Sequence, residues 1–263
     1  MSRLLLFFLV VCASWSARAD LPAAMKAIER GHYSTAVRAL RKPAELGDQH
    51  ARNNLGYLYE YGLGVNRNPE EAFKWYRLAA EGGLPAAQYN LATLYLQGRG
   101  TPTDTQAAFH WYEAAAKAGY ADAEYMLGEC YRTGAGTKRD GALALSWYLK
   151  AARNGSSAAQ LMAASIYYTG EGWRRELPKA MVWAELARLN GEAQAVGLTV
   201  QISRDLNEAQ KALAVEKAKL CKDSKYQDCP EQEVLLASFL LTLFAQSAEY
   251  VLQPMPLKFG LAQ

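Results

Sequence analysis

Residue types that bind phosphate, bind metals or catalyse reactions occur in this chain without completing a functional pattern. The Gly62-x-Gly64 pair resembles part of a phosphate-binding loop, but the sequence predicts no strand before it and no Lys-Ser/Thr pair after it. His32, His50 and His110 lie far apart, with no nucleophile or metal-ligand spacing around them. We therefore predict no catalytic residue, no metal site and no cofactor.

The glycine pair belongs instead to a repeated pattern. It returns at a fixed spacing as Gly98-x-Gly100, Gly134-x-Gly136 and Gly170-x-Gly172. The residues around the first copy recur with it, and these are Ala51, Leu55-Gly56, Leu58-Tyr59, Ala72, Trp75-Tyr76, Ala79-Ala80 and Gly83. Such a period predicts a solenoid of stacked units, in which no unit can bury its apolar face alone.

Two helices are predicted in each unit. Ala51, Leu55, Leu58 and Tyr59 are spaced to share one face of a first helix, and a glycine then ends that helix. The second helix begins after an N-cap residue, which is Asn68, Asp104 or Asp140 in the first three copies. The fourth copy has Glu176 at that position, which is a weaker cap.

The repeats divide the chain into five parts. We expect a signal peptide over residues 1–19, an N-terminal capping half-repeat over 20–50, and four repeats over 51–194. The repeats are placed at 51–86, 87–122, 123–158 and 159–194, and residues 195–263 form a C-terminal helical extension with a cysteine loop.

The order Ala-x3-Leu-Gly-x2-Tyr, Gly-x-Gly, Ala-x2-Trp-Tyr-x2-Ala-Ala-x2-Gly resembles that of Sel1-like repeats, which are relatives of tetratricopeptide repeats. This resemblance implies an all-α fold, a right-handed α/α superhelical solenoid whose first helices line a concave surface. It also implies a non-enzymatic adaptor that binds a protein or peptide partner. A near-neutral formal charge of +3 gives no electrostatic reason to expect nucleic acid.

Partner specificity is expected at first-helix positions that vary between copies while the repeat frame stays constant. Tyrosine is the commonest residue there, and it offers apolar contact with a polar tip. The predicted partner-binding residues are Asn53, Tyr57, Glu60, Tyr61, Tyr89, Thr93, Tyr125, Glu129, Arg132 and Tyr168. An alternative interpretation stays open for each tyrosine, namely that it packs against the first helix of the next unit.

The N-terminus indicates export from the cytoplasm. Arg3 precedes a short apolar run, and Ala17-Arg18-Ala19 supplies small residues for cleavage before Asp20. We therefore predict a periplasmic or secreted protein.

The cysteines fit such a compartment. Cys221 and Cys229 flank a polar loop, and we predict a disulfide between them. Cys130 occupies an apolar position of the repeat, so we interpret it as a buried hydrophobe. A second function stays open by resemblance, because some cysteine-rich Sel1-like proteins have been assigned β-lactam binding or hydrolysis. Those relatives carry a cysteine pair in each repeat, whereas the repeats of this chain contain Cys130 alone.

The segment Glu231–Leu252 is the most apolar part of the predicted mature chain, and three interpretations of it stay open. It caps the solenoid, forms a seam with a partner or with a second copy in a homodimer, or anchors an assembly factor to the envelope membrane. Gln246 and Glu249 would be costly inside lipid, so we favour the cap.

Overall fold

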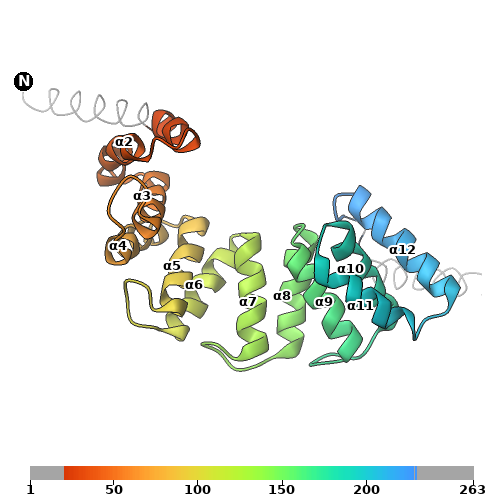
Figure 1. Cartoon of the computed structure of the whole chain (residues 1–263). Coiled ribbons are helices and arrows are strands. Elements are labelled where there is room, and N and C mark those ends of the chain that lie inside the picture. The colour runs from red at the N-terminus through yellow and green to blue at the C-terminus, as the bar shows by residue number, and fades with distance from the viewer. Residues whose placement is uncertain (1–20, 228, 230–263) are drawn as a thin grey trace, which may run out of the picture.

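Helices alone form the regular structure of the described part of the chain. The computed structural model describes residues 21–227 and 229, and within these residues it contains helices and turns but no strand. The helices follow one another in a curved array from α2 to α12 (Figure 1). This arrangement confirms the predicted all-α solenoid. The predicted leader and the apolar segment 231–252 lie outside the described residues.

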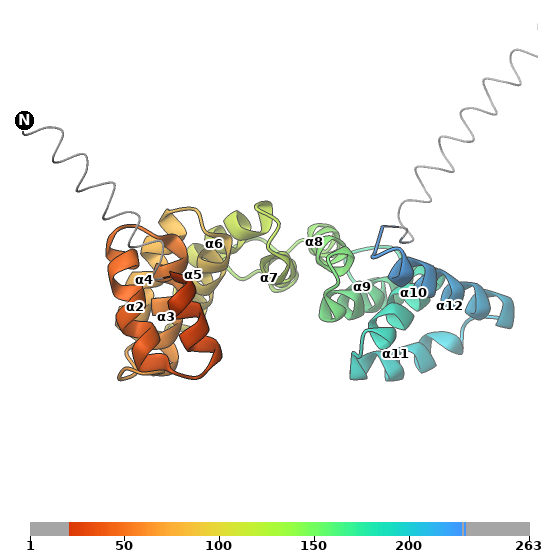
Figure 2. The same ribbon diagram turned by 90° about the horizontal axis from the view of Figure 1, so that it is seen from above.

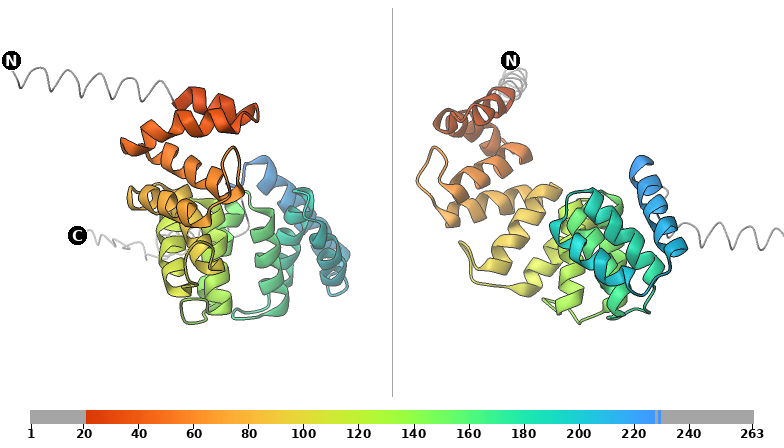
Figure 3. Two further views of the ribbon diagram at one scale, coloured as in Figure 1. Left: turned by 60° about the vertical axis from the view of Figure 1, so that its left-hand side comes forward. Right: turned by 45° about the vertical axis from the view of Figure 1, so that its right-hand side comes forward.

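Most of the array consists of helix pairs of equal length. Residues 21–29 are helical and precede α2, which spans Tyr33–Glu45. The first helices of the four repeats are α3 (Gln49–Tyr61), α5 (Pro85–Gln97), α7 (Ala121–Thr133) and α9 (Ser157–Thr169). The second helices are α4 (Pro69–Glu81), α6 (Thr105–Lys117), α8 (Gly141–Arg153) and α10 (Leu177–Leu189). Figure 3 shows from two sides that the pairs stack in chain order.

The turn within each pair follows from its glycines and its N-cap. Gly62 adopts φ 70° and donates its backbone N–H to the carbonyl of Leu58, which ends α3. Asn68 then accepts a hydrogen bond from the backbone N–H of Glu71 and starts α4. Asp104 and Asp140 do the same one and two periods later, whereas Glu176 makes no side-chain cap bond. The predicted difference between the strong caps and the weak one is therefore confirmed.

The second glycine of each pair is needed for close approach between units. Gly100 lies at φ 70°, and a Cβ at this position would clash with the carbonyl of Pro69 at the start of α4. Only glycine admits both this conformation and this contact without strain. The loop of one repeat therefore rests directly on the second helix of the repeat before it.

The core runs along the stack between first and second helices. Each first helix packs against the second helix of its own repeat and the second helix of the repeat before it. Paired alanines such as Ala79 and Ala80 are buried, and beside them the rings of Tyr76, Tyr112 and Tyr148 are fully buried. Small side chains let the helices approach closely while the tyrosines fill the remaining space.

The C-terminal end departs from this regular pairing. α11 (Ala193–Ser203) occupies the place of a fifth first helix, and α12 (Glu208–Asp223) begins with a capping box formed by Asn207 and Gln210. α12 packs along α10 and makes few contacts with α11. In Figure 2, α12 runs beside α10 and α11 lies below both. α12 thus covers the last second helix instead of completing a fifth pair.

Candidate protein-binding surface on the first helices

The first helices of neighbouring repeats lie side by side, which brings the variable position Asn53 next to Asn90, a residue outside the predicted set. Asn90 of α5 donates an amide hydrogen bond to the side-chain oxygen of Asn53 of α3 over 3.0 Å. The bond uses one N–H of Asn90 and the side-chain oxygen of Asn53. Among the described residues, the amide N–H groups of Asn53 and the side-chain oxygen of Asn90 make no other hydrogen bond, so they can bond a ligand. We call the side of the first helices that carries these positions the first-helix surface.

Tyr57 and Tyr61 form an aromatic shelf next to this amide pair. They lie one turn apart on α3, their ring centroids are 4.6 Å apart, and they are 45% and 54% exposed. Side chains four residues apart share one face of a helix, which explains why the rings meet. The shelf offers apolar area with two hydroxyl groups at its edge.

Tyr89 extends the aromatic area onto α5, although its ring is partly buried. The ring lies 5.6 Å from that of Tyr112 and 5.4 Å from that of Tyr120. Burial, and then the nearby carboxylate of Asp122, raise the pKa of Tyr89. Its hydroxyl therefore stays protonated at neutral pH and is available as a hydrogen-bond donor.

Glu60 does not lie on this surface, contrary to the sequence expectation for its side chain. It is buried, accepts a hydrogen bond from the Tyr76 hydroxyl at 2.9 Å, and pairs with Arg99 at 2.7 Å. Burial, and then the charge of Glu60, raise the pKa of Tyr76. Because both its partners come from other elements, Glu60 joins α3 to α4 and to the loop of the next repeat.

Thr93 and Glu129 occupy the equivalent of position 57 in the next two repeats, and both contact the buried tyrosine of their own second helix. The Thr93 hydroxyl lies 2.9 Å from that of Tyr112, and the Tyr148 hydroxyl donates to Glu129 at 2.5 Å. Arg132 pairs with Glu129 at 2.6 Å. These predicted residues therefore help to close their own helix pairs as well as lying on the first helices.

The remaining predicted tyrosines are less free than the shelf. The ring of Tyr125 is partly buried and lies 5.7 Å from that of Tyr148. The ring of Tyr168 is covered by the guanidinium of Arg175, whose central carbon lies 5.3 Å from the ring centroid. The most accessible tyrosines of the predicted set are thus Tyr57 and Tyr61 on α3.

The sequence analysis did not identify one polar position whose side chain joins adjacent repeats. In three repeats its side chain donates to a carbonyl near the end of the preceding second helix, as Arg52 does to Ala44 and Gln160 to Ala152. Gln88 makes the same contact with Ala80. The sequence does show an arginine or glutamine at this position in three repeats, one period apart. The third repeat has a glutamate there, so the pattern is not continuous.

The third repeat achieves the same joint with a different residue. Glu124 occupies the position and is completely buried, and its carboxylate has no N–H to donate. Lys150 of α8 takes over, since its ammonium donates to the carbonyl of Ala116 at 3.3 Å and pairs with Glu124 at 3.0 Å. Asn154 donates to the other carboxylate oxygen at 2.7 Å.

The glycine pairs and Cys130 have structural roles, and the described residues include no cluster of metal ligands. The Gly62 turn and its copies end first helices, as described above. Burial raises the pKa of the Cys130 thiol to about 11, so it is protonated at neutral pH and is not an activated nucleophile. Within residues 21–227 and 229, no group of three or more His, Cys, Asp or Glu side chains could hold a metal ion.

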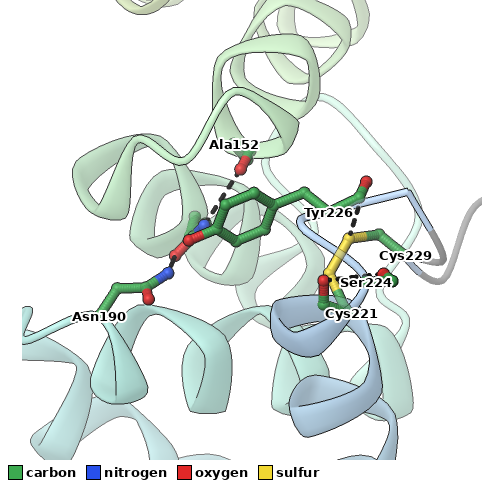
Figure 4. The surroundings of a disulfide bond; sticks show 7 residues. Ala152, Asn190, Cys221, Ser224, Tyr226 and Cys229 are labelled. Atoms are coloured by element: carbon green, nitrogen blue, oxygen red, sulfur yellow. Dashed lines mark hydrogen bonds between the residues drawn. A yellow bond between two sulfur atoms is a disulfide. The ribbon is translucent and has the colours of Figure 1, made fainter.

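A disulfide fixes the end of α12, as the sequence predicted. Cys221 and Cys229 are bonded (Figure 4). Lys222 donates to the carbonyl of Leu189 at the end of α10. The ring of Tyr226 lies over Gly155, where an added Cβ would come within 3.2 Å of it. This corner therefore holds α12 against the turns before α9 and after α10.

A depression lies away from the first-helix surface. It has a volume of about 690 Å³ and separates the N-terminal halves of α10 and α12. Leu177, Val182 and Leu213 contribute apolar walls, and the ion pair of Arg175 with Asp205, at 2.7 Å, lies at its edge.

Comparisons with known proteins identify the repeats. A family model described as the Sel1 repeat matches residues 49–84, 85–120, 121–156 and 157–192. A Sel1 repeat protein from Oxalobacter formigenes is 30% identical with a TM-score of 0.67, covering 76% of this chain and 83% of that one. A protective antigen present in uropathogenic Escherichia coli strains, displaying an SLR fold, is 26% identical with a TM-score of 0.71.

That second match covers 95% of this chain and 52% of the antigen, so the chain spans about half of the antigen's length. A comparison with curated proteins found no match. Among the described residues, none of the helices has the length and apolar character needed to cross a membrane.

Proposed function

The chain belongs to the Sel1 repeat family, and from this premise we propose that it is an extracytoplasmic adaptor that binds a protein segment across α3 and α5. Sel1 repeat proteins in general are scaffolds that mediate protein–protein interaction. The observation that carries the proposal is the exposed shelf of Tyr57 and Tyr61 beside the amide pair of Asn53 and Asn90.

The shelf and the amide pair suit an extended peptide. Tyrosine rings supply contact area at a low cost in side-chain entropy, because few bonds must be fixed on binding. The open N–H of Asn53 and the open carbonyl of Asn90 can each bond one peptide group of a bound backbone. Apolar side chains of the segment would then rest on the two rings.

Two features support a compartment outside the cytoplasm. The N-terminal sequence resembles a cleavable leader, and the disulfide between Cys221 and Cys229 fits an oxidising environment. N-terminal sequencing of protein recovered from the periplasmic or secreted fraction should therefore read from Asp20. A chain recovered from the cytoplasm with its leader intact would contradict this part of the proposal.

Site-specific crosslinking tests the surface. A photoreactive phenylalanine analogue at position 57 should trap one partner protein in the producing cell. The same analogue at Leu143, a similarly exposed position on the second helix α8, should trap none. Trapping of the same protein from both positions, or from neither, would refute the assigned surface.

The trapped partner is then tested with purified protein. Tyr57→Ala combined with Tyr61→Ala should weaken its affinity by about 30-fold or more, because each lost anchor typically costs about 1 kcal/mol or more. Leu78→Ala with Leu143→Ala removes two exposed apolar side chains from second helices and should leave the affinity unchanged. Circular dichroism would confirm that both variants fold.

A further inference from the structure

α11 presents an apolar face that the rest of the described chain leaves uncovered. Val196 and Val200 lie one turn apart on this face and are each 52% exposed. Ala193 and Gly197 continue the stripe and are also exposed, and a Cβ added to Gly197 would meet nothing within 4 Å. The stripe combines small and β-branched side chains, so another helix could approach it closely.

Two positions of this face, 196 and 200, correspond to first-helix positions that contact a second helix in the complete repeats. Position 200 corresponds to Gly56 and Gly128, and a Cβ at either glycine would lie 2.7 Å from the ring of the repeat's own second-helix tyrosine. Position 196 corresponds to Arg52, which reaches the carbonyl of Leu78 on its own second helix at 3.4 Å. The open face of α11 is therefore the place where a second helix belongs.

α12 cannot fill this place, because it is held elsewhere. Ala214, Ala218 and Cys221 of α12 are buried, and α12 packs along α10. The bond from Lys222 to the carbonyl of Leu189 fixes its far end. Any second helix for α11 must come from residues that follow the disulfide or from another molecule.

We propose that the segment Glu231–Leu252 of the same chain docks on the face of α11 formed by Ala193, Val196, Gly197 and Val200. The chain leaves the disulfide corner at Cys229, and this corner contacts Leu189, only four residues before α11 begins at Ala193. The segment thus starts beside the near end of the open face.

The length and composition of the segment fit that site. Its 22 residues would span about 33 Å as a helix, and the 11 residues of α11 span about 16 Å. Its polar residues Ser238, Thr242, Gln246 and Glu249 fall on one helical stripe, while Leu236 and Leu240 lie opposite. As a helix, this segment would bury every face except its polar stripe, and the open face of α11 can pack against the side that carries Leu236 and Leu240.

Hydrogen exchange of the complete, disulfide-bonded protein tests the proposal. Amides between residues 234 and 250 should exchange at least about tenfold more slowly than in a free peptide of the same sequence. Val196→Asp combined with Val200→Asp should abolish that protection. Leu213→Asp combined with Leu220→Asp, two equally exposed leucines of α12, is the matched control and should retain it.

A reciprocal change guards against a misfolded variant. Leu236→Asp with Leu240→Asp alters only the segment, and it should raise the exchange of α11 amides while those of α3 stay unchanged. Exchange of the wild-type segment at the free-peptide rate would overturn the proposal. Protection that survives the Val196 and Val200 changes would also overturn it, as would protection that depends on protein concentration together with a dimer mass in light scattering.

Discussion

Lys150→Met should destabilise the joint between the second and third repeats, because it removes the cation that faces a buried carboxylate. Glu124 is completely buried, and the Lys150 ammonium lies 3.0 Å from one of its oxygens. The same ammonium satisfies the carbonyl of Ala116 at 3.3 Å. The substitution therefore leaves two acceptors without this donor, and only the bond from Asn154 to Glu124 remains.

The magnitude follows from how much of the pair is shielded from water. Removing one partner of a fully buried pair typically costs about 3–5 kcal/mol. The Lys150 side chain is 46% exposed, so solvent screens part of the interaction, and we expect a loss of about 2–3 kcal/mol. For a domain of this size the thermal midpoint should fall by about 4–12 °C.

The fourth repeat shows how the same joint is made without a charge. Gln160 donates to the carbonyl of Ala152 at 3.0 Å and accepts a bond from Asn190 at 2.9 Å. Asn154 stands one period before Asn190 and already points at position 124. A glutamine at position 124 can therefore satisfy the Ala116 carbonyl by itself.

The double variant Glu124→Gln/Lys150→Met should consequently recover most of the lost stability. A deficit of about 0.5–1 kcal/mol should remain, because the Lys150 ammonium also lies 4.9 Å from the centroid of the Trp147 ring. Lys117→Met removes an exposed pair with Glu113 and serves as the control, with an expected change below about 0.5 kcal/mol.

Urea and thermal unfolding followed by circular dichroism measure these differences. The reasoning fails if Lys150→Met is no more harmful than Lys117→Met. It also fails if the double variant is as unstable as Lys150→Met alone.

Three further changes test other parts of the structure. Gly56→Ala should destabilise by about 1–3 kcal/mol because its Cβ meets a buried tyrosine ring, and the urea midpoint measures this loss. Burial alone would raise the pKa of Glu176, but hydrogen bonds from its neighbours outweigh it and lower the pKa. Its contribution is therefore complete above the unfolded value and is lost as pH falls through the folded one, so the stability gap to Glu176→Gln should close between about pH 5 and pH 3; a constant gap would contradict this. Replacing Cys221 and Cys229 by serine should cost about 2–3 kcal/mol for a loop of this length, and an unchanged melting curve would show that the bond contributes nothing.

The fold was predictable because its determinants are local. The glycine that ends α3 and the asparagine that starts α4 act within a few residues of their own positions, and both recur at a fixed interval. Periodic burial of Leu55 and Leu58 then follows from helical spacing alone. None of these features requires knowledge of a distant part of the chain.

The surface was only partly predictable, because exposure depends on neighbours from other elements. Helical spacing gives Glu60 and Tyr61 adjacent positions, yet Tyr61 is exposed while Glu60 is buried under Tyr76 and Arg99. The position of Arg99 holds Leu63 in the preceding copy, so the repeat pattern does not predict the ion pair between Arg99 and Glu60. The burial of a polar residue between repeats is thus a property of two copies together.

The irregular C-terminal end has a cause that lies inside the last repeat. Val182 stands where earlier copies have Lys74, His110 and Ser146, all exposed, but it is buried and lines the depression between α10 and α12. Leu186 is likewise buried, although Lys150 at the equivalent position is exposed. These two apolar residues lie one turn apart, so they give the outer face of α10 a stripe that earlier second helices lack. Covering that stripe holds α12 on α10, and the helix that covers α10 cannot also pair with α11. Val182 and Leu186 thus hold α12 on α10, and as a result the face of α11 that would take a second helix stays uncovered.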